Sequence, residues 1–107
     1  MLFLLSVKLA KPAGMSNQEF YGVWEKEYAG VSGAVQAGLV KWVYKVAGSP
    51  QVVAVVEVGS ADDMDHAINS LPIWSLGYSH IVTDVTWTPL RSYDSWGEDL
   101  KKLAQGG

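Results

Sequence analysis

The chain has 107 residues and a formal net charge of −3, which suits a single domain with one core. Its 49% hydrophobic residues, with five Trp and five Tyr, provide large side chains to bury and argue against extensive disorder. The absence of cysteine excludes disulfides, thiolate metal sites and a cysteine nucleophile. The sequence carries no basic patch of the kind that nucleic-acid binding needs, and no apolar run reaches the roughly 18 residues of a membrane span. Lys8 and Lys11 interrupt the apolar start, so we expect no signal peptide and a cytoplasmic protein.

The first half of the chain predicts a strand, a helix and a hairpin. Residues 1–10 alternate between an apolar and a mixed face, as a strand does. Ser16 and Glu19 form a capping box for a helix that runs to about Ala37, and Gly38 is the expected stop. Two strands, 39–47 and 51–58, are joined by the turn residues 48–50 and form an antiparallel hairpin.

The second half predicts another helix, a last strand and a tail. Ser60 opens a helix that runs to about Asn69, and Pro72 marks a stop and a connection. In the last strand, His80, Val82, Asp84 and Thr86 fall on one face, opposite Ile81, Thr83, Val85 and Trp87. The tail repeats apolar residues at helical spacing, namely Tyr93, Trp96, Leu100 and Leu103.

This order, β-α-β-β-α-β, predicts an α+β fold of the ferredoxin-like type with a C-terminal tail helix. We expect a domain over residues 1–90 and an extension, 91–107, that packs on its own or a neighbouring subunit. Two helices cover one face of such a sheet, yet most strands here carry apolar or aromatic groups on both faces. A large exposed apolar face is unusual in a soluble monomer, so we expect a homo-oligomer in which a second chain covers it.

Several short motifs resemble the muconolactone Δ-isomerase family, which belongs to the dimeric α+β barrel group. The start M-L-F-L, with Pro12 and Met15, is similar to the family's start. Lys45–Gly48 resembles its R-[IV]-[AV]-G turn, residues 55–58 its V-F-D-V strand, and Leu71–Ile73 its L-P-L. The resemblance covers about residues 1–90.

The resemblance implies a homo-oligomer, which is a dimer or a higher assembly such as a decamer. It also implies an isomerase that moves a proton between carbons of a small unsaturated lactone, without metal or organic cofactor. Glu27 stands where the family carries a Glu in its first helix, so it is the implied base. The family's W-R-H-L-W corresponds here to residues 40–44, where the Arg–His pair is missing, and H-Y-A-N-Y corresponds to residues 49–53. These departures predict a larger and less charged substrate.

The residues themselves suggest further candidates, and each also has a simpler structural interpretation. Glu27 could equally belong to a solvated helix face. His80 and Asp84 are ~13 Å apart along one strand face, so they cannot form a dyad, although each could face a pocket. Tyr44 could donate to an enolate oxygen, or be plain core with Trp42. The remaining aromatic residues could wall a pocket or only fill the core: Tyr28, Trp74 and Tyr78.

Three functions stay open at this point. The first is a cofactor-free isomerase or cyclase that acts by proton transfer on a small, rather apolar, carbonyl-activated substrate such as a lactone, an enone or a polyketide-like intermediate. The second is a cofactor-independent monooxygenase of the related barrel group. The third is a non-catalytic ligand-binding protein with a decayed site. No metal motif or phosphate loop is found, so we expect neither metal nor cofactor.

Overall fold

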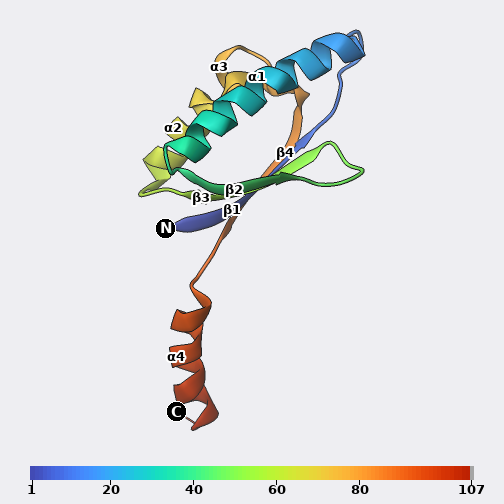
Figure 1. Cartoon of the computed structure of the whole chain (residues 1–107). Helices are drawn as coiled ribbons and strands as arrows, with labels where there is room; N and C mark the ends of the chain where they lie inside the picture. The colour runs from blue at the N-terminus through green and yellow to red at the C-terminus, as the bar shows by residue number, and fades with distance from the viewer. Residues whose placement is uncertain (107) are drawn as a thin grey trace.

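A four-stranded antiparallel sheet organises the computed structural model, which describes residues 1–106 (Figure 1). The sheet order is β2-β3-β1-β4, and every neighbouring pair is antiparallel. The predicted β-α-β-β-α-β order and ferredoxin-like fold are confirmed. The elements are β1 (Leu2–Leu9), α1 (Asn17–Gln36), β2 (Val40–Lys45), β3 (Gln51–Glu57), α2 (Ala61–Ser70), α3 (Pro72–Ser75), the 3-10 turn η1 (Ser79–Ile81), β4 (Val82–Pro89) and α4 (Tyr93–Ala104).

Both ends of α1 follow from local chemistry, as the sequence predicts. The Ser16 hydroxyl accepts the backbone N–H of Glu19 at 3.1 Å, which satisfies one of the free donors of the first turn. At the other end Gly38 has φ +83°, a conformation that glycine adopts without strain. Leu39 N then bonds to Ala34 O at 3.0 Å, closing a Schellman motif.

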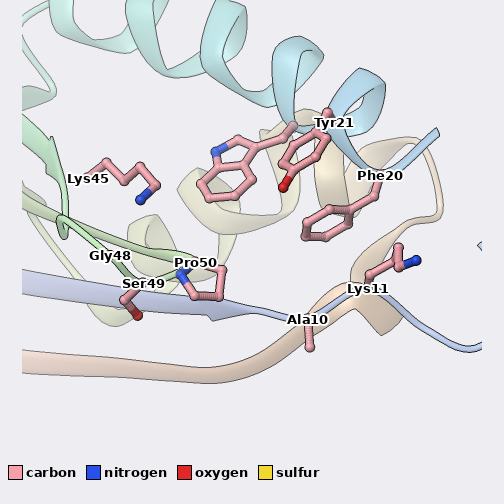
Figure 2. A pocket seen from close by; sticks show the side chains of 9 residues that line it. Ala10, Lys11, Phe20, Tyr21, Lys45, Gly48, Ser49 and Pro50 are labelled. Atoms are coloured by element: carbon pink, nitrogen blue, oxygen red, sulfur yellow. The ribbon is translucent and has the colours of Figure 1, made fainter. Parts of the chain in front are cut away.

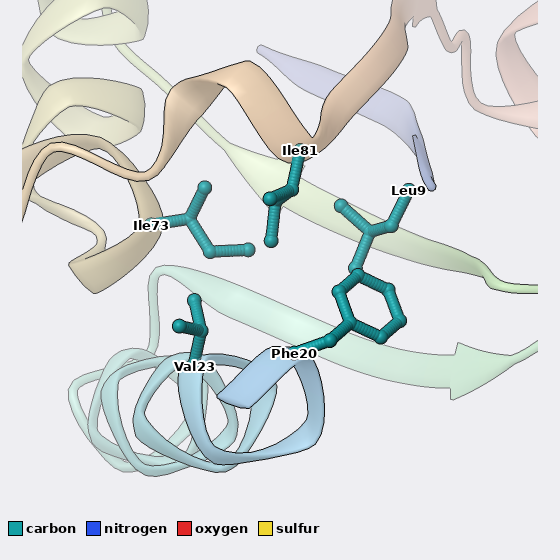
Figure 3. Close-up of a cluster of buried hydrophobic side chains, with 5 residues drawn as sticks. All are labelled: Leu9, Phe20, Val23, Ile73 and Ile81. Atoms are coloured by element: carbon teal, nitrogen blue, oxygen red, sulfur yellow. The ribbon is translucent and has the colours of Figure 1, made fainter. Parts of the chain in front are cut away.

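The helices α1, α2 and α3 cover one face of the sheet (Figure 1). Phe20 and Val23 of α1 contact Leu9 of β1, with Ile73 and Ile81 from the connection, in the most deeply buried part of the core (Figure 3). A second cluster lies further along the sheet and consists of Leu5, Val40, Ala54 and Val56. The first cluster therefore holds the first turns of α1 against the sheet, and the second contacts the helix at Ala34, near its end.

The connection after α2 contains a short helix, where the sequence predicts only a stop and a connection. Pro72 begins α3, because a proline fits the first helical position, where its missing N–H leaves no bond unmade. α3 lies against α1, and the side chain of Pro72 packs directly on Gly30. Pro72 therefore ends one helical segment and starts another that contacts α1.

The predicted face shared by His80, Val82 and Asp84 is wrong. β4 begins only at Val82, and His80 lies in the preceding 3-10 turn. The pairing with β1 then passes from Lys8 opposite Asp84 to Leu9 opposite Val82, so one residue bulges out of the ladder. This irregularity shifts the alternation, and Val82 packs against the first core cluster.

The other face of the sheet carries no helix (Figure 1). Trp42 and Tyr44 stand on it opposite Val55 and Val53, with their ring centroids 5.4 Å apart. Their residues are 41% and 67% exposed. The predicted tail helix is present as α4, which stands apart from the sheet beyond the end of β4 (Figure 1). The last residue of the expected extension, Gly107, lies outside the described residues. Among residues 1–106, no helix is long and apolar enough to cross a membrane.

Candidate active site

A cavity of about 710 Å³ lies between α1, α3 and the covered face of the sheet. Aliphatic residues of β1, β2 and β3 form its floor, and aromatic side chains stand around it: Trp24, Tyr28, Trp74 and Trp87. Within residues 1–106, the charged residues that border this cavity are Glu27 and Lys45. The site is therefore an apolar chamber with a single carboxylate, which is the kind of environment that ligand sites favour.

Glu27 holds a core position on α1. Phe20, Val23 and Glu27 are the buried residues of this helix and recur at helical spacing, so they share its inner face. Glu27 is only 8% exposed. Glu27 is therefore a charged residue in a stripe of buried apolar residues.

One oxygen of the Glu27 carboxylate is bound and the other is free. Oε1 accepts the backbone N–H of Ile73 at 3.1 Å, near the start of α3. In the part of the chain that the structure describes, no buried side-chain oxygen or nitrogen lacks a partner. Oε2 has no such bond, so it must be accessible, and the space that Glu27 borders is the cavity. One oxygen anchors the side chain while the other is available for a proton.

Burial raises the pKa of the Glu27 carboxyl above its ordinary value of 4.5, because the apolar surroundings disfavour the charged form. The hydrogen bond from Ile73 works in the opposite direction, since it stabilises the carboxylate, but the effect of burial is larger. A carboxylate with a raised pKa is a stronger base than an exposed one, which suits it to proton transfer near neutral pH.

The raised pKa gives a prediction about pH. If Glu27 is a base, the proton-transfer rate rises with pH through the raised pKa, with a midpoint above 4.5. The pH dependence of stability has the opposite sign, because the folded state binds this proton more tightly than the unfolded state does. Between 4.5 and the raised pKa, the contribution of Glu27 to the free energy of unfolding therefore falls as pH rises.

The measurement compares rate and stability against pH for the parent and Glu27→Gln. The stability contribution of Glu27 is the difference between the two unfolding curves. A midpoint of the rate at or below 4.5, or a contribution that grows through this window, would contradict the assignment.

The structure brings some of the sequence-predicted residues to the cavity with Glu27. Tyr28 and Trp74 border it, from α1 and α3. Tyr44 also borders it, but its ring is next to Trp42 on the uncovered face of the sheet. Trp87 and Lys45 are among the bordering residues that the prediction did not select. Trp87 comes from the apolar face of the last strand, and Lys45 is the last residue of β2, so neither differs in pattern from a structural residue.

The other predicted residues lie elsewhere. His80 is exposed in the 3-10 turn, with its ring centroid 6.4 Å from that of Tyr78. Tyr78 itself packs against the first core cluster. Asp84 is exposed on β4, where it accepts a hydrogen bond from the Thr86 hydroxyl at 3.2 Å. These three residues and Trp42 are not among those that border the cavity in the described part of the chain.

The chain thus combines a ferredoxin-like fold with one buried carboxylate at the border of an apolar cavity. A family model described as muconolactone delta-isomerase matches residues 1–95, so the chain belongs to this family. Among solved structures, a crystal structure of muconolactone isomerase is similar, with a TM-score of 0.69 and 17% sequence identity over 86% of this chain and 90% of that one. A search of curated proteins found no match. The family supports an isomerase-like or related barrel-family function.

Proposed function

We propose that the protein is a cofactor-free isomerase that moves a proton between two carbons of an apolar, carbonyl-activated small molecule. The observation that carries this proposal is the free oxygen of Glu27 in the apolar cavity, with a pKa raised by burial. Family membership supports it independently.

In the proposed reaction, Glu27 takes a proton from the carbon next to the carbonyl, and the electrons of that C–H bond move into the carbonyl to form an enolate. The protonated Glu27 then returns the proton to a different carbon of the conjugated system. The double bond shifts, the carbonyl reforms, and the carboxylate is restored. No electron leaves the substrate, so the step needs no redox partner.

An enolate needs a donor for its oxygen, since charge builds up there in the transition state. Tyr28 borders the cavity and is 70% exposed, so it lies at the open side of the cavity, and we place its hydroxyl in this role. Tyr44, Trp42, His80 and Asp84 are not part of the proposed centre. Trp74 forms a wall of the chamber, and Tyr78 supports the core beside it.

The test is carbon–hydrogen exchange in deuterated water, followed by NMR. Candidate compounds are unsaturated lactones, enones and bicyclic ketones. The expected result is exchange above the rate without protein, at a carbon next to the carbonyl. No exchange with any of these classes would overturn the proposal.

A non-catalytic ligand-binding role is the second candidate, and one observation favours it. The bond from Ile73 N–H makes Glu27 a cap for the start of α3, so the carboxylate has a structural reason to be present. This alternative predicts binding of apolar compounds without exchange, and the same NMR experiment separates the two.

We also propose that the uncovered face of the sheet is an interface between copies of this chain, and that α4 packs on a neighbouring subunit. Trp42 and Tyr44 are exposed there beside the apolar strand residues Val53 and Val55. The apolar side of α4 is likewise exposed in the single chain, at Tyr93, Trp96, Leu100 and Leu103. Exposed clusters of large apolar residues such as these two are expected to be covered in solution.

Light scattering at micromolar concentration checks the interface. We expect the parent to exceed the 11.6 kDa of one chain by a factor of two or more. Trp42→Asp introduces a charge on the proposed interface and is expected to shift the population towards the monomer. His66→Asp, at an exposed position of α2, is the matched control and should leave the assembly intact. A monomeric parent would contradict the proposal.

A further inference from the structure

A second hollow, of about 360 Å³, is lined by the residues drawn in Figure 2. It lies between the first turns of α1 and the turn that joins β2 and β3, and it is bordered by Lys11, Phe20, Tyr21, Trp24, Lys45 and Pro50, among others. Trp24 and Lys45 border both spaces, so the hollow and the cavity meet at this pair.

The charged residues that the structure describes around the hollow are all positive. Its charged residues, among those the structure describes, are Lys11 and Lys45, and no carboxylate borders it. Figure 2 shows the two lysines at opposite ends of the hollow, so one small ligand group would contact only one of them. Lys45 is the one that also borders the cavity with Glu27.

The ammonium group of Lys45 has hydrogen-bond donors that are not engaged within the described chain. Its Nζ gives one hydrogen bond to the carbonyl oxygen of Val46 at 3.0 Å, while an ammonium group has three donors. The ion pairs within residues 1–106 involve other groups: the N-terminus with Glu57, Arg91 with Asp99, and Lys101 with Glu98. A ligand anion at the junction would therefore meet an ammonium group that no carboxylate neutralises.

The spacing along α1 sets the length of a ligand that uses both spaces. Tyr21 and Glu27 are six residues apart, which is about 9 Å along a helix that rises 1.5 Å per residue. A ligand with its reacting carbon at Glu27 and its apolar far end beside Tyr21 is therefore longer than one five-membered ring.

We propose that the hollow is a second binding compartment, which takes the far end of an elongated substrate, and that an anionic oxygen on the remote ring of this substrate is bound by Lys45 at the junction of the two spaces. The proposal rests on the proposed function for the other end, the carbonyl-activated carbon at Glu27. The substrate class is a flat, apolar bicyclic ketone or enone with a carboxylate on the ring remote from the carbonyl.

Binding is tested with two stable mimics of a bicyclic enol. One is β-naphthol, and the other is β-naphthol with a carboxylate on the far ring; calorimetry gives Kd for each. We expect the acid to bind more tightly to the parent, and Lys45→Met to weaken the acid about tenfold while β-naphthol is unchanged. Lys41→Met removes a positive charge from the same strand, at an exposed position away from both spaces, and should change neither Kd. Lys45→Arg should restore most of the preference.

Exchange is tested with β-tetralone and its far-ring carboxylate. We expect the acid to exchange faster than β-tetralone in the parent. Lys45→Met should remove this difference in rate, and Lys41→Met should keep it. The second compartment would be overturned if the parent exchanged the acid and the neutral compound at equal rates. It would also be overturned if Lys45→Met and Lys41→Met lost the rate advantage of the acid to the same extent. If β-tetralone exchanged without any preference for the carboxylate, the compartment would fail while the proposed function stood. If neither compound exchanged, the Kd values would still decide the compartment, and exchange of the unsaturated lactones and enones would decide the proposed function.

Discussion

Glu27→Gln is expected to abolish exchange almost completely, by a factor of about 10³, because an amide cannot take a proton from carbon. The change is otherwise mild. The amide oxygen of the new side chain can accept the N–H of Ile73 as the carboxylate Oε1 does at 3.1 Å. The substitution also removes the cost of burying a charge. The unfolding midpoint of the variant should equal or exceed that of the parent at neutral pH.

Two comparisons separate chemistry from structure at this position. Glu25→Gln, on an exposed part of the same helix turn, should keep the parental exchange rate. Glu27→Ala removes the acceptor as well, and leaving the Ile73 N–H unbonded should lower the free energy of unfolding by about 1–3 kcal/mol. If Glu27→Gln kept the parental rate while Glu27→Ala lost stability, the carboxylate would be a helix cap without a catalytic role.

Much of this fold could be predicted from local chemistry. The caps at Ser16 and Ser60, the stop at Gly38 and the alternation of the first strand are local signals, and each places an element correctly. The last strand was misplaced at its start because a bulge depends on the pairing of β1 and β4, which no local pattern reveals. His80 and Asp84 were candidates only while the alternation was assumed to be unbroken.

The candidate site, too, could be predicted only in part, because some of its residues are placed by packing between distant elements. Glu27 is predicted from the family resemblance, because the residues around it leave a solvated helix face equally open; its burial on the same face as Phe20 and Val23 is seen only in the structure. Lys45 and Trp87 could not be selected, since a strand lysine and an apolar strand residue look alike whether or not they border a cavity. The side of the sheet on which Trp42 and Tyr44 lie is set by pairing with β3. The size of the chamber depends on how α1 and α3 pack.

That packing depends on Gly30, and two glycine substitutions on α1 should have opposite effects on stability. A Cβ at Gly30 would lie 2.6 Å from Cδ of Pro72 and 2.9 Å from Cγ, while one at Gly33 would meet nothing within 4 Å. Both changes replace a poor helix former by the best one, which by itself favours folding by roughly 1 kcal/mol. Gly33→Ala should therefore stabilise the protein by up to about that amount.

Gly30→Ala should destabilise instead, by about 1–3 kcal/mol net, because a rigid proline ring and the backbone of α1 must separate to admit the methyl group. Moving α3 away also draws the Ile73 N–H from Glu27, one helical turn before Gly30. We therefore expect exchange to fall by about tenfold or more in Gly30→Ala while the protein remains folded, since small displacements of a catalytic group are costly. Urea unfolding and the exchange assay, run on both variants, give the comparison. Equal stability changes in the two variants would mean that α1 and α3 are not in close contact, and that Glu27 is held in place by something other than this helix pair.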